Sequence, residues 1–289
     1  MTARISDTSS NRASASDAAK KSGIKLVAID LDGTLLDDSK RISEPTAAAI
    51  AEISRRGVRV VIASARPPRS VRHLYRELGL DTWQINYNGA LIWDEPGSRV
   101  VFHQPMQPEL VRLLIDRARE RFPSVLVTCE ILDRWHTDRS EQPYTTETGR
   151  LFQPDVVAPL EEFLNQPITK LLLLGDPDCI DQMTPLLSAG EGAEVSVVRT
   201  DPHLIQIMDR RVSKAAALKK VAEHYGVELS EVMAIGDAPN DVEMLQIAGV
   251  AVAMDNAALS VKQAAEWVAP SNNDHGVHAA LERYLGKRV

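Results

Sequence analysis

Short apolar runs alternate with segments of helical character along much of this chain. The run Leu26–Ile29 is apolar at every position, which predicts a strand that is buried on both faces. The segment SEPTAAAIAEISRRG follows, with Ser43 as a candidate N-cap and Gly57 as the helix stop. A second apolar run, VRVVIASAR, precedes a helix that we predict over residues 68–78 and that stops at Gly79. The segment QINYNGA predicts a third short strand.

The same pattern returns near the C-terminus. The segment SKAAALKKVAEHYG predicts a helix that ends at Gly226, and EVMAIGDAPND and AGVAVAM each predict another strand. Strands that alternate with helices and are apolar on both faces are typical of a parallel sheet. The two ends of the chain therefore predict one doubly wound, Rossmann-like α/β domain.

The middle of the chain, from about residue 91 to 204, has a different pattern. Isolated strand-like runs stand there around two helical patterns and irregular polar segments. The strand-like runs are Arg99–Phe102, Ser124–Glu130, Thr169–Leu174 and Glu194–Arg199. We therefore predict a core domain formed by residues 23–90 and 205–289, with a second α/β domain, 91–204, inserted into it as a cap. Residues 1–22 are rich in Ser and Ala without an apolar core, and we expect a disordered tail.

Composition excludes several classes of function. The 289 residues are 44% hydrophobic and 25% charged, as in globular proteins, and the net charge of −7 offers no basic surface for nucleic acid or an anionic membrane. No apolar stretch approaches the roughly 20 residues that span a bilayer. The two cysteines, Cys129 and Cys179, form no CxxC pattern, and we interpret them as reduced thiols of a cytoplasmic protein.

Polar residues gather where the predicted strands end or helices begin. They form four groups: Asp30 with Asp32, Ser64 alone, Lys214 alone, and Asp237 with Asn240 and Asp241. Taken singly, each group has an ordinary interpretation as a turn residue, a helix cap or a surface charge. Taken together and in order, they lie at the edge of an open α/β sheet where ligands bind.

The paired acids suit phosphoryl transfer. Two carboxylates at the end of a buried strand repel each other, so a cation is the simplest compensation. Asp30 can act as a nucleophile because it is ionised at neutral pH, and Asp32 can serve as acid and then base. Mg²⁺ would screen the nucleophile from the phosphate, with ligands expected from Asp30, a backbone carbonyl near Asp32, and Asp237. Lys214, Ser64 and Asn240 would hold the phosphate oxygens.

These motifs resemble those of the haloacid dehalogenase superfamily, in its Cof-like branch with an inserted α/β cap. The matching segments are DLDGTLL, IASARP, INYNGALI, SKAAAL, IGDAPNDVEML and AVAMDNAALSVKQAA. The resemblance implies a phosphatase for small phosphorylated metabolites, such as sugar phosphates or phosphorylated cofactors. It also implies that Asp30 carries an aspartyl phosphate, and that Asp237 and Asp241 serve the metal.

Two positions differ from the usual family pattern. The chain has Ser64-Ala65-Arg66 where Thr-Gly-Arg is more common, and Ala215 where glycine follows the lysine. Because Ser64 still supplies a hydroxyl group, we expect the chemistry to survive both changes.

Two other functions use similar residues. A phosphomutase forms the same aspartyl phosphate and returns the group to a sugar. A receiver-like domain accepts phosphate as a signal without being an enzyme, but it is a single domain of about 120 residues and has no inserted domain. The long insertion and the GDxxND segment favour an enzyme.

The cap would choose the substrate. The segment DRWHTDR offers four candidates for stacking or phosphate contacts: Arg134, Trp135, His136 and Arg139. The expected partner is a small phosphate monoester, and the chain is expected to act as a monomer or homodimer.

Overall fold

The computed structural model describes residues 23–139, 144, 149–150, 152–189 and 194–286. The predicted tail, residues 1–22, lies outside these described residues. Within them, no helix combines the length and the apolar character that crossing a membrane would need. Cys129 and Cys179 are both free thiols.

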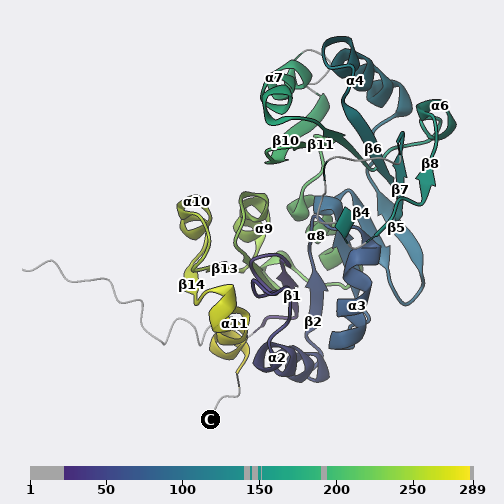
Figure 1. Ribbon diagram of the computed structural model, residues 1–289. Helices are drawn as coiled ribbons and strands as arrows, with labels where there is room; N and C mark the ends of the chain where they lie inside the picture. The colour runs from purple at the N-terminus through teal and green to yellow at the C-terminus, as the bar shows by residue number, and fades with distance from the viewer. Residues whose placement is uncertain (1–22, 140–143, 145–148, 151, 190–193, 287–289) are drawn as a thin grey trace, which may run out of the picture.

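A five-stranded parallel sheet forms the centre of the first unit (Figure 1). Its order is β14-β13-β12-β1-β2, and each neighbouring pair is parallel. The strands are β1 (Leu26–Ile29), β2 (Arg59–Ile62), β12 (Val232–Gly236), β13 (Val250–Met254) and β14 (Trp267–Ala269). The doubly wound parallel sheet predicted from the apolar runs is confirmed.

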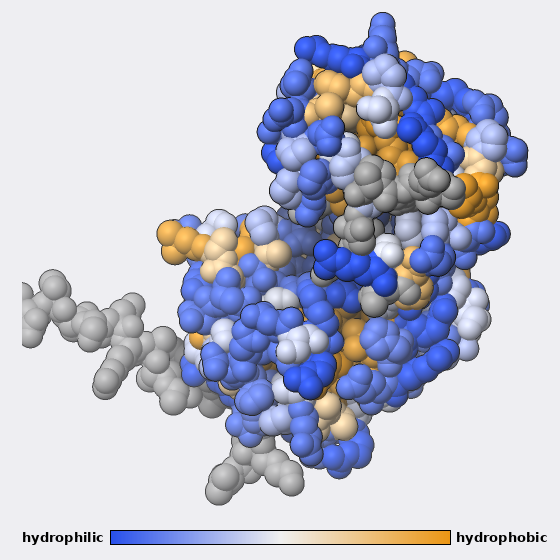
Figure 2. Space-filling model, viewed as in Figure 1, coloured by the Kyte–Doolittle hydropathy of each residue, from blue (hydrophilic) through white to orange (hydrophobic). Residues whose placement is uncertain are grey.

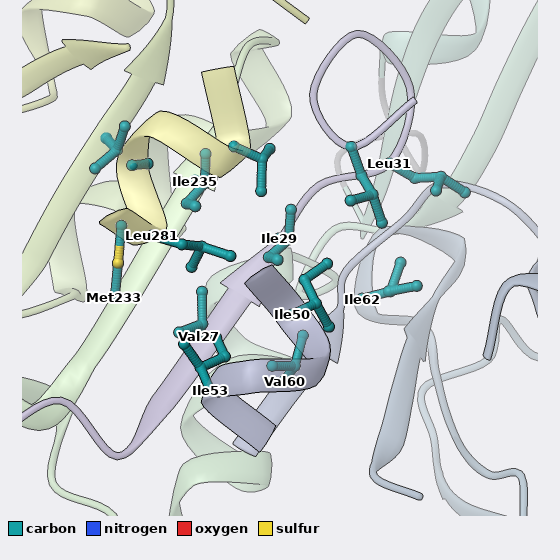
Figure 3. Packing of buried hydrophobic residues seen from close by; sticks show 14 of the residues in the cluster. Val27, Ile29, Leu31, Ile50, Ile53, Val60, Ile62, Met233, Ile235 and Leu281 are labelled. Atoms are coloured by element: carbon teal, nitrogen blue, oxygen red, sulfur yellow. The ribbon is translucent and has the colours of Figure 1, made fainter. Parts of the chain in front are cut away.

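Helices cover both faces of this sheet. Val27 and Ile29 of β1 point toward Ile50 and Ile53, whereas Leu26 and Ala28 belong to a separate buried cluster on the other face (Figure 3). The first face carries α2 (Glu44–Arg55), α3 (Pro68–Leu78) and α11 (Gly276–Leu285). The other carries α8 (Lys214–His224), α9 (Val242–Ile247) and α10 (Leu259–Gln263). Because side chains alternate along a strand, each four-residue run must be apolar throughout to fill both layers.

The third predicted strand lies elsewhere. The strand β3 (Trp83–Asn86) meets the parallel sheet through an isolated bridge between Ala63 and Ile85. It pairs antiparallel with β4 (Leu91–Asp94), which pairs in turn with β5 (Arg99–His103). Between β3 and β4 lies the short turn η1 (Tyr87–Gly89). The segment is a strand as predicted, but it belongs to a separate three-stranded sheet.

A six-stranded sheet forms the second unit, in the order β10-β11-β9-β6-β7-β8. Its strands are β6 (Leu126–Ile131), β7 (Arg134–Thr137), β8 (Val156–Val157), β9 (Lys170–Leu174), β10 (Val195–Asp201) and β11 (Leu204–Asp209). Its helices are α4 (Pro108–Arg121), α6 (Leu160–Phe163) and α7 (Pro177–Ser188). Figure 1 shows α4 and α7 on the side of this sheet that is turned away from the first unit. The opposite face is therefore turned toward the five-stranded sheet.

Two lobes result from this arrangement, and the face of them seen in Figure 2 is largely hydrophilic. The buried cluster of the second unit is built from residues between Met106 and Ile207. Ile92, in contrast, packs in a cluster with Ala215 and Leu218 of the first unit. The division into 23–90, 91–204 and 205–289 stays a prediction, and this packing favours a later start for the inserted part.

Candidate active site

Three carboxylates meet at the carboxyl edge of the parallel sheet. Asp30 follows β1 directly, and its backbone N–H still donates to the carbonyl of Ile235 at 2.9 Å. Asp237 follows β12, and Asp241 ends the short turn η4 (Pro239–Asp241). One carboxylate oxygen from each of the three acids lies within 4.8 Å of the others. The parallel topology thus brings together acids that are about 200 residues apart in the sequence.

Lys214 stands between two of these acids. Its side chain is completely buried at the start of α8, and its ammonium donates to Asp30 and, at 2.6 Å, to Oδ1 of Asp241. The other oxygen of Asp241 accepts the backbone N–H groups of Asp237 and Ala238, at 3.0 and 2.9 Å. Asp241 is therefore held on both sides and fixes the lysine in place.

Negative charge remains in excess within this group. Burial raises the pKa of Asp30 to about 8; the charge of Lys214 opposes the rise, and the charges of Asp241 and Asp237 add to it. The pKa of Lys214 is raised, because the two acids that it contacts outweigh the effect of its burial. Three carboxylates and one ammonium leave an excess of two negative charges when all are ionised. A divalent cation would balance that excess.

Asp32 is held apart from the acidic cluster. Arg66 donates to both of its oxygens, from Nε at 2.7 Å and from Nη2 at 2.5 Å, and Lys40 donates to Oδ1 at 2.7 Å. Burial works to raise the pKa of Asp32, but these hydrogen bonds and charges outweigh it and the net pKa is lowered. The described carboxylate cluster does not include Asp32, so its side chain has a different environment from that of Asp30.

Ser64 and Asn240, the expected phosphate binders, lie on two loops, and Asn88 on a third loop forms hydrogen bonds to both of them. Ser64 is buried after β2, and its hydroxyl accepts the backbone N–H of Arg66 at 3.1 Å. Asn240 is exposed on η4, and its amide donates to Oδ1 of Asn88 at 2.9 Å. Asn88 in turn donates its backbone N–H to the carbonyl of Ser64 at 3.0 Å.

Sequence reasoning gave no role to several residues that contact this site. Thr34 donates to Oδ1 of Asp237 at 3.0 Å, and Asn256 donates to the carbonyl of Gly33 at 2.8 Å. Asn256 lies in the segment AVAMDNAALSVKQAA, whose likeness to the family was the available signal. Arg66 and Asn88 also lie in matching segments, but only the folded chain shows which side chains they contact.

The four cap candidates are not brought together. Trp135 is buried and donates its indole N–H to Thr128, whereas His136 packs against the ring of Phe163 at 5.5 Å between centroids. Arg134 and Arg139 are exposed. Because neighbours on a strand point to opposite faces, His136 is directed toward the helices and Trp135 toward the other face.

Comparison with known proteins places the chain in a family. A family model described as haloacid dehalogenase-like hydrolase matches residues 27–281. The chain belongs to this family. The haloacid dehalogenase-like fold is confirmed by the crystal structure of such a hydrolase from Bacteroides thetaiotaomicron, which superimposes with a TM-score of 0.82 at 29% identity, covering 90% of this chain and 99% of that one. A Thermotoga maritima protein gives a TM-score of 0.81 at 30% identity, over 90% and 97% of the two chains.

A curated relative of this haloacid dehalogenase-like enzyme carries a specific name. The 5-amino-6-(5-phospho-D-ribitylamino)uracil phosphatase YitU of Bacillus subtilis is 31% identical over 269 residues, which cover 90% of this chain and 97% of the relative. The resemblance deduced from the motifs is confirmed, and the chain is an enzyme of a hydrolase family whose relatives include phosphatases.

Proposed function

We propose that this enzyme is a Mg²⁺-dependent phosphatase that hydrolyses small phosphate monoesters through an aspartyl phosphate on Asp30. The observation that carries the proposal is the contact of the buried Lys214 with both Asp30 and Asp241, beside Asp237. A structural role alone does not explain three acids around one lysine, because buried charge that is not balanced is costly. A site that receives a divalent cation and a phosphate dianion does explain it.

The acidic cluster fits Mg²⁺ by the chemistry of its donors. Mg²⁺ prefers oxygen ligands and is commonly bound by one or two carboxylates together with waters and phosphate oxygens. Asp30 and Asp237 are the carboxylates that we assign to the ion, with Asp241 as a ligand or as the group that orients them. When bound, the ion would supply positive charge against the nucleophile and the phosphate. The backbone carbonyl near Asp32 is the further ligand that we expect.

The residues of the chain would then act in two steps. Asp30 attacks phosphorus, and the bond to the leaving oxygen breaks while that oxygen takes a proton from Asp32. Water then attacks phosphorus, Asp32 accepts its proton, and Asp30 leaves as a carboxylate. Lys214 and Ser64 hold the phosphate oxygens throughout. The lowered pKa of Asp32 favours the ionised form that the second step needs and opposes the protonated form that donates in the first step.

Substrate choice is assigned to the face of the six-stranded sheet that is turned toward the site. Strand pairing places Thr128 opposite Leu172, and Leu172 opposite Gln206, in one row across that face. The next row holds Glu130 opposite Lys170. These polar side chains are better placed than His136 to contact a leaving group. Of the four candidates from the sequence, Trp135 shares this face.

The experiment that tests the function is a phosphate-release screen of the purified protein. It uses p-nitrophenyl phosphate and a panel of sugar phosphates and phosphorylated cofactors, with Mg²⁺, with chelator, and with Ca²⁺ in place of Mg²⁺. The panel includes 5-amino-6-(5-phospho-D-ribitylamino)uracil, because a relative is named for it. We expect hydrolysis with Mg²⁺, none in excess chelator, and little with Ca²⁺, whose larger and looser shell would misplace the nucleophile.

Two outcomes would count against the proposal. Full turnover in excess chelator would reject the metal-dependent mechanism. Transfer of the phosphoryl group to a second hydroxyl of the sugar, without release of phosphate, would identify a phosphomutase instead.

A further inference from the structure

The turn η1 contains two consecutive non-glycine residues with left-handed backbone. Tyr87 has φ of 48° and Asn88 has φ of 55°, and Gly89 follows with φ of 102°. A bulky residue such as tyrosine seldom adopts this conformation, and such residues gather at ligand clamps and switch regions. Surrounding contacts must therefore hold the turn in place.

On one side, these contacts come from the loops of the candidate active site. Besides the two contacts of Asn88, to Ser64 and Asn240, the backbone N–H of Tyr87 donates to the carbonyl of Arg66 at 3.2 Å. A Cβ atom at Gly89 would collide with the backbone of Ser213, the residue before Lys214. The turn thus touches the loops of Ser64, Lys214 and Asn240.

On the other side, the contacts come from the six-stranded unit. The hydroxyl of Tyr87, which is fully buried, lies 2.8 Å from the carbonyl of Leu132 and 3.0 Å from Oε2 of Glu130. Its ring packs with Met208 of β11, and the ammonium of Lys170 lies 5.2 Å from the ring centroid. The side chain of Tyr87 therefore contacts the second unit, whereas the side chain of the next residue, Asn88, accepts a hydrogen bond from Asn240 of the first unit.

We propose that Tyr87 and Asn88 are positioning residues, which couple the placement of the six-stranded unit to the orientation of Asn240 at the phosphate. Anchoring the Tyr87 hydroxyl keeps the backbone of Asn88 left-handed, and the Asn88 amide then directs the amide of Asn240. When the second unit moves away, the anchor is lost and Asn240 loses its orientation. This inference rests on the proposed function, because it assigns Asn240 to the phosphate.

Tyr87→Phe tests the coupling, and Tyr75→Phe is its matched control. Tyr75 is equally buried, and its hydroxyl donates to the carbonyl of Trp83 in β3 at 3.0 Å and accepts the backbone N–H of Ile62 in β2 at 3.2 Å. We expect both variants to lose similar thermal stability. Only Tyr87→Phe should raise KM for p-nitrophenyl phosphate and weaken the binding of inorganic phosphate, each by roughly three- to tenfold, as expected for one hydrogen bond.

A double-mutant cycle separates positioning from a general structural effect. In an Asn240→Ala background, Tyr87→Phe should change phosphate binding by less than about twofold, because the side chain through which it acts is gone. Asn88→Gly keeps the left-handed backbone, removes the amide, and should reproduce the effect of Tyr87→Phe. This variant also tests the inference if Tyr87→Phe does not fold.

Three results would overturn the inference. They are an equal loss of phosphate binding in Tyr75→Phe, an undiminished effect of Tyr87→Phe in the Asn240→Ala background, and unchanged binding in both Tyr87→Phe and Asn88→Gly. Phosphate binding measured by calorimetry keeps this test separate from turnover. If the natural chain hydrolyses no phosphate ester, the proposed function fails, whereas the coupling is still decided by binding.

Discussion

Arg66 forms a bidentate ion pair with Asp32, with Nε 2.7 Å from Oδ2 and Nη2 2.5 Å from Oδ1. This ion pair gives the two acids of the DLDGT segment opposite environments. The pKa of Asp32 is lowered, whereas burial and the neighbouring acids raise the pKa of Asp30 to about 8. Two acids with different environments are expected to have different tasks. The raised pKa of Asp30 opposes the ionised form that a nucleophile needs, so this task requires a cation beside Asp30 to lower that pKa.

The first prediction concerns those tasks. Asp30→Asn removes the nucleophile, so turnover of p-nitrophenyl phosphate should fall to background. Asp32→Asn keeps the nucleophile, and an aryl leaving group needs little protonation, so the first step should survive in part. The second step should slow by about 10²–10⁴-fold, because water has lost its base. Mass spectrometry of rapidly quenched Asp32→Asn samples should then show one added phosphoryl group on Asp30.

The position of the label decides this assignment. A phosphoryl group on any residue other than Asp30 would contradict it, and so would indistinguishable behaviour of the two variants. Arg66→Lys is a further variant for this test, because lysine keeps the positive charge but cannot form the bidentate hydrogen bonds to Asp32.

The second prediction concerns the cation and Gly33. Gly33 has φ of 80°, and a Cβ atom there would collide with the carboxylate of Asp237. Gly33→Ala should displace this expected ligand and raise the Mg²⁺ concentration for half-maximal activity by roughly 10- to 100-fold. Gly57→Ala is the control, since Gly57 has a similar φ of 85° but open space around its Cβ position. A similar shift in both variants would attribute the effect to backbone strain alone.

Much of the core could be predicted from the sequence, because buried parallel strands must be apolar on both faces. The run at β1 and the runs at β12 and β13 follow this rule. Chain topology then brings Asp30 and Asp237 to one edge. Strand β7 was not predicted, because its sequence RWHT contains no apolar run: Arg134 and His136 lie on the side of the helices, and Trp135 and Thr137 on the other side.

The side-chain contacts of the site could not be predicted from the sequence as the strands could. The pairing of Arg66 with Asp32 joins residues that are 34 positions apart. The contact between Asn88 and Asn240 spans 152 positions. No local pattern encodes such pairs, since they depend on how loops from different strands approach each other. The same limit applies to the cap, where a shift of one residue along a strand moves a side chain to the other face.

The third prediction concerns pH and Lys170. Burial lowers the pKa of this lysine to about 8, while the charge of Glu130 opposes that effect and the charge of Arg69 adds to it. An unfolded lysine has a pKa of about 10.4. Between about pH 8 and 10, the unfolded chain therefore binds a proton that the folded chain lacks, and the free energy of unfolding rises with pH.

Lys170→Met should remove this rise. The free energy of unfolding of the variant minus that of the natural chain should be largest at pH 7. This difference should fall by on the order of 3 kcal/mol between pH 7 and pH 10. Urea denaturation at several pH values measures the difference. Lys219→Met, at an exposed position of α8, should show no such pH dependence. A difference that is constant between pH 7 and 10 would contradict the prediction.

The last prediction separates the two faces of the six-stranded sheet. Gln206 lies in the row with Leu172 and Thr128 on the face turned toward the first unit, whereas His136 packs against Phe163. Gln206→Leu should change the relative kcat/KM of natural esters by roughly tenfold or more, since a lost hydrogen-bonding group alters discrimination. It should affect p-nitrophenyl phosphate little. His136→Leu should change the melting temperature but keep the order of substrates. A reordering by His136→Leu and none by Gln206→Leu would assign specificity to the other face.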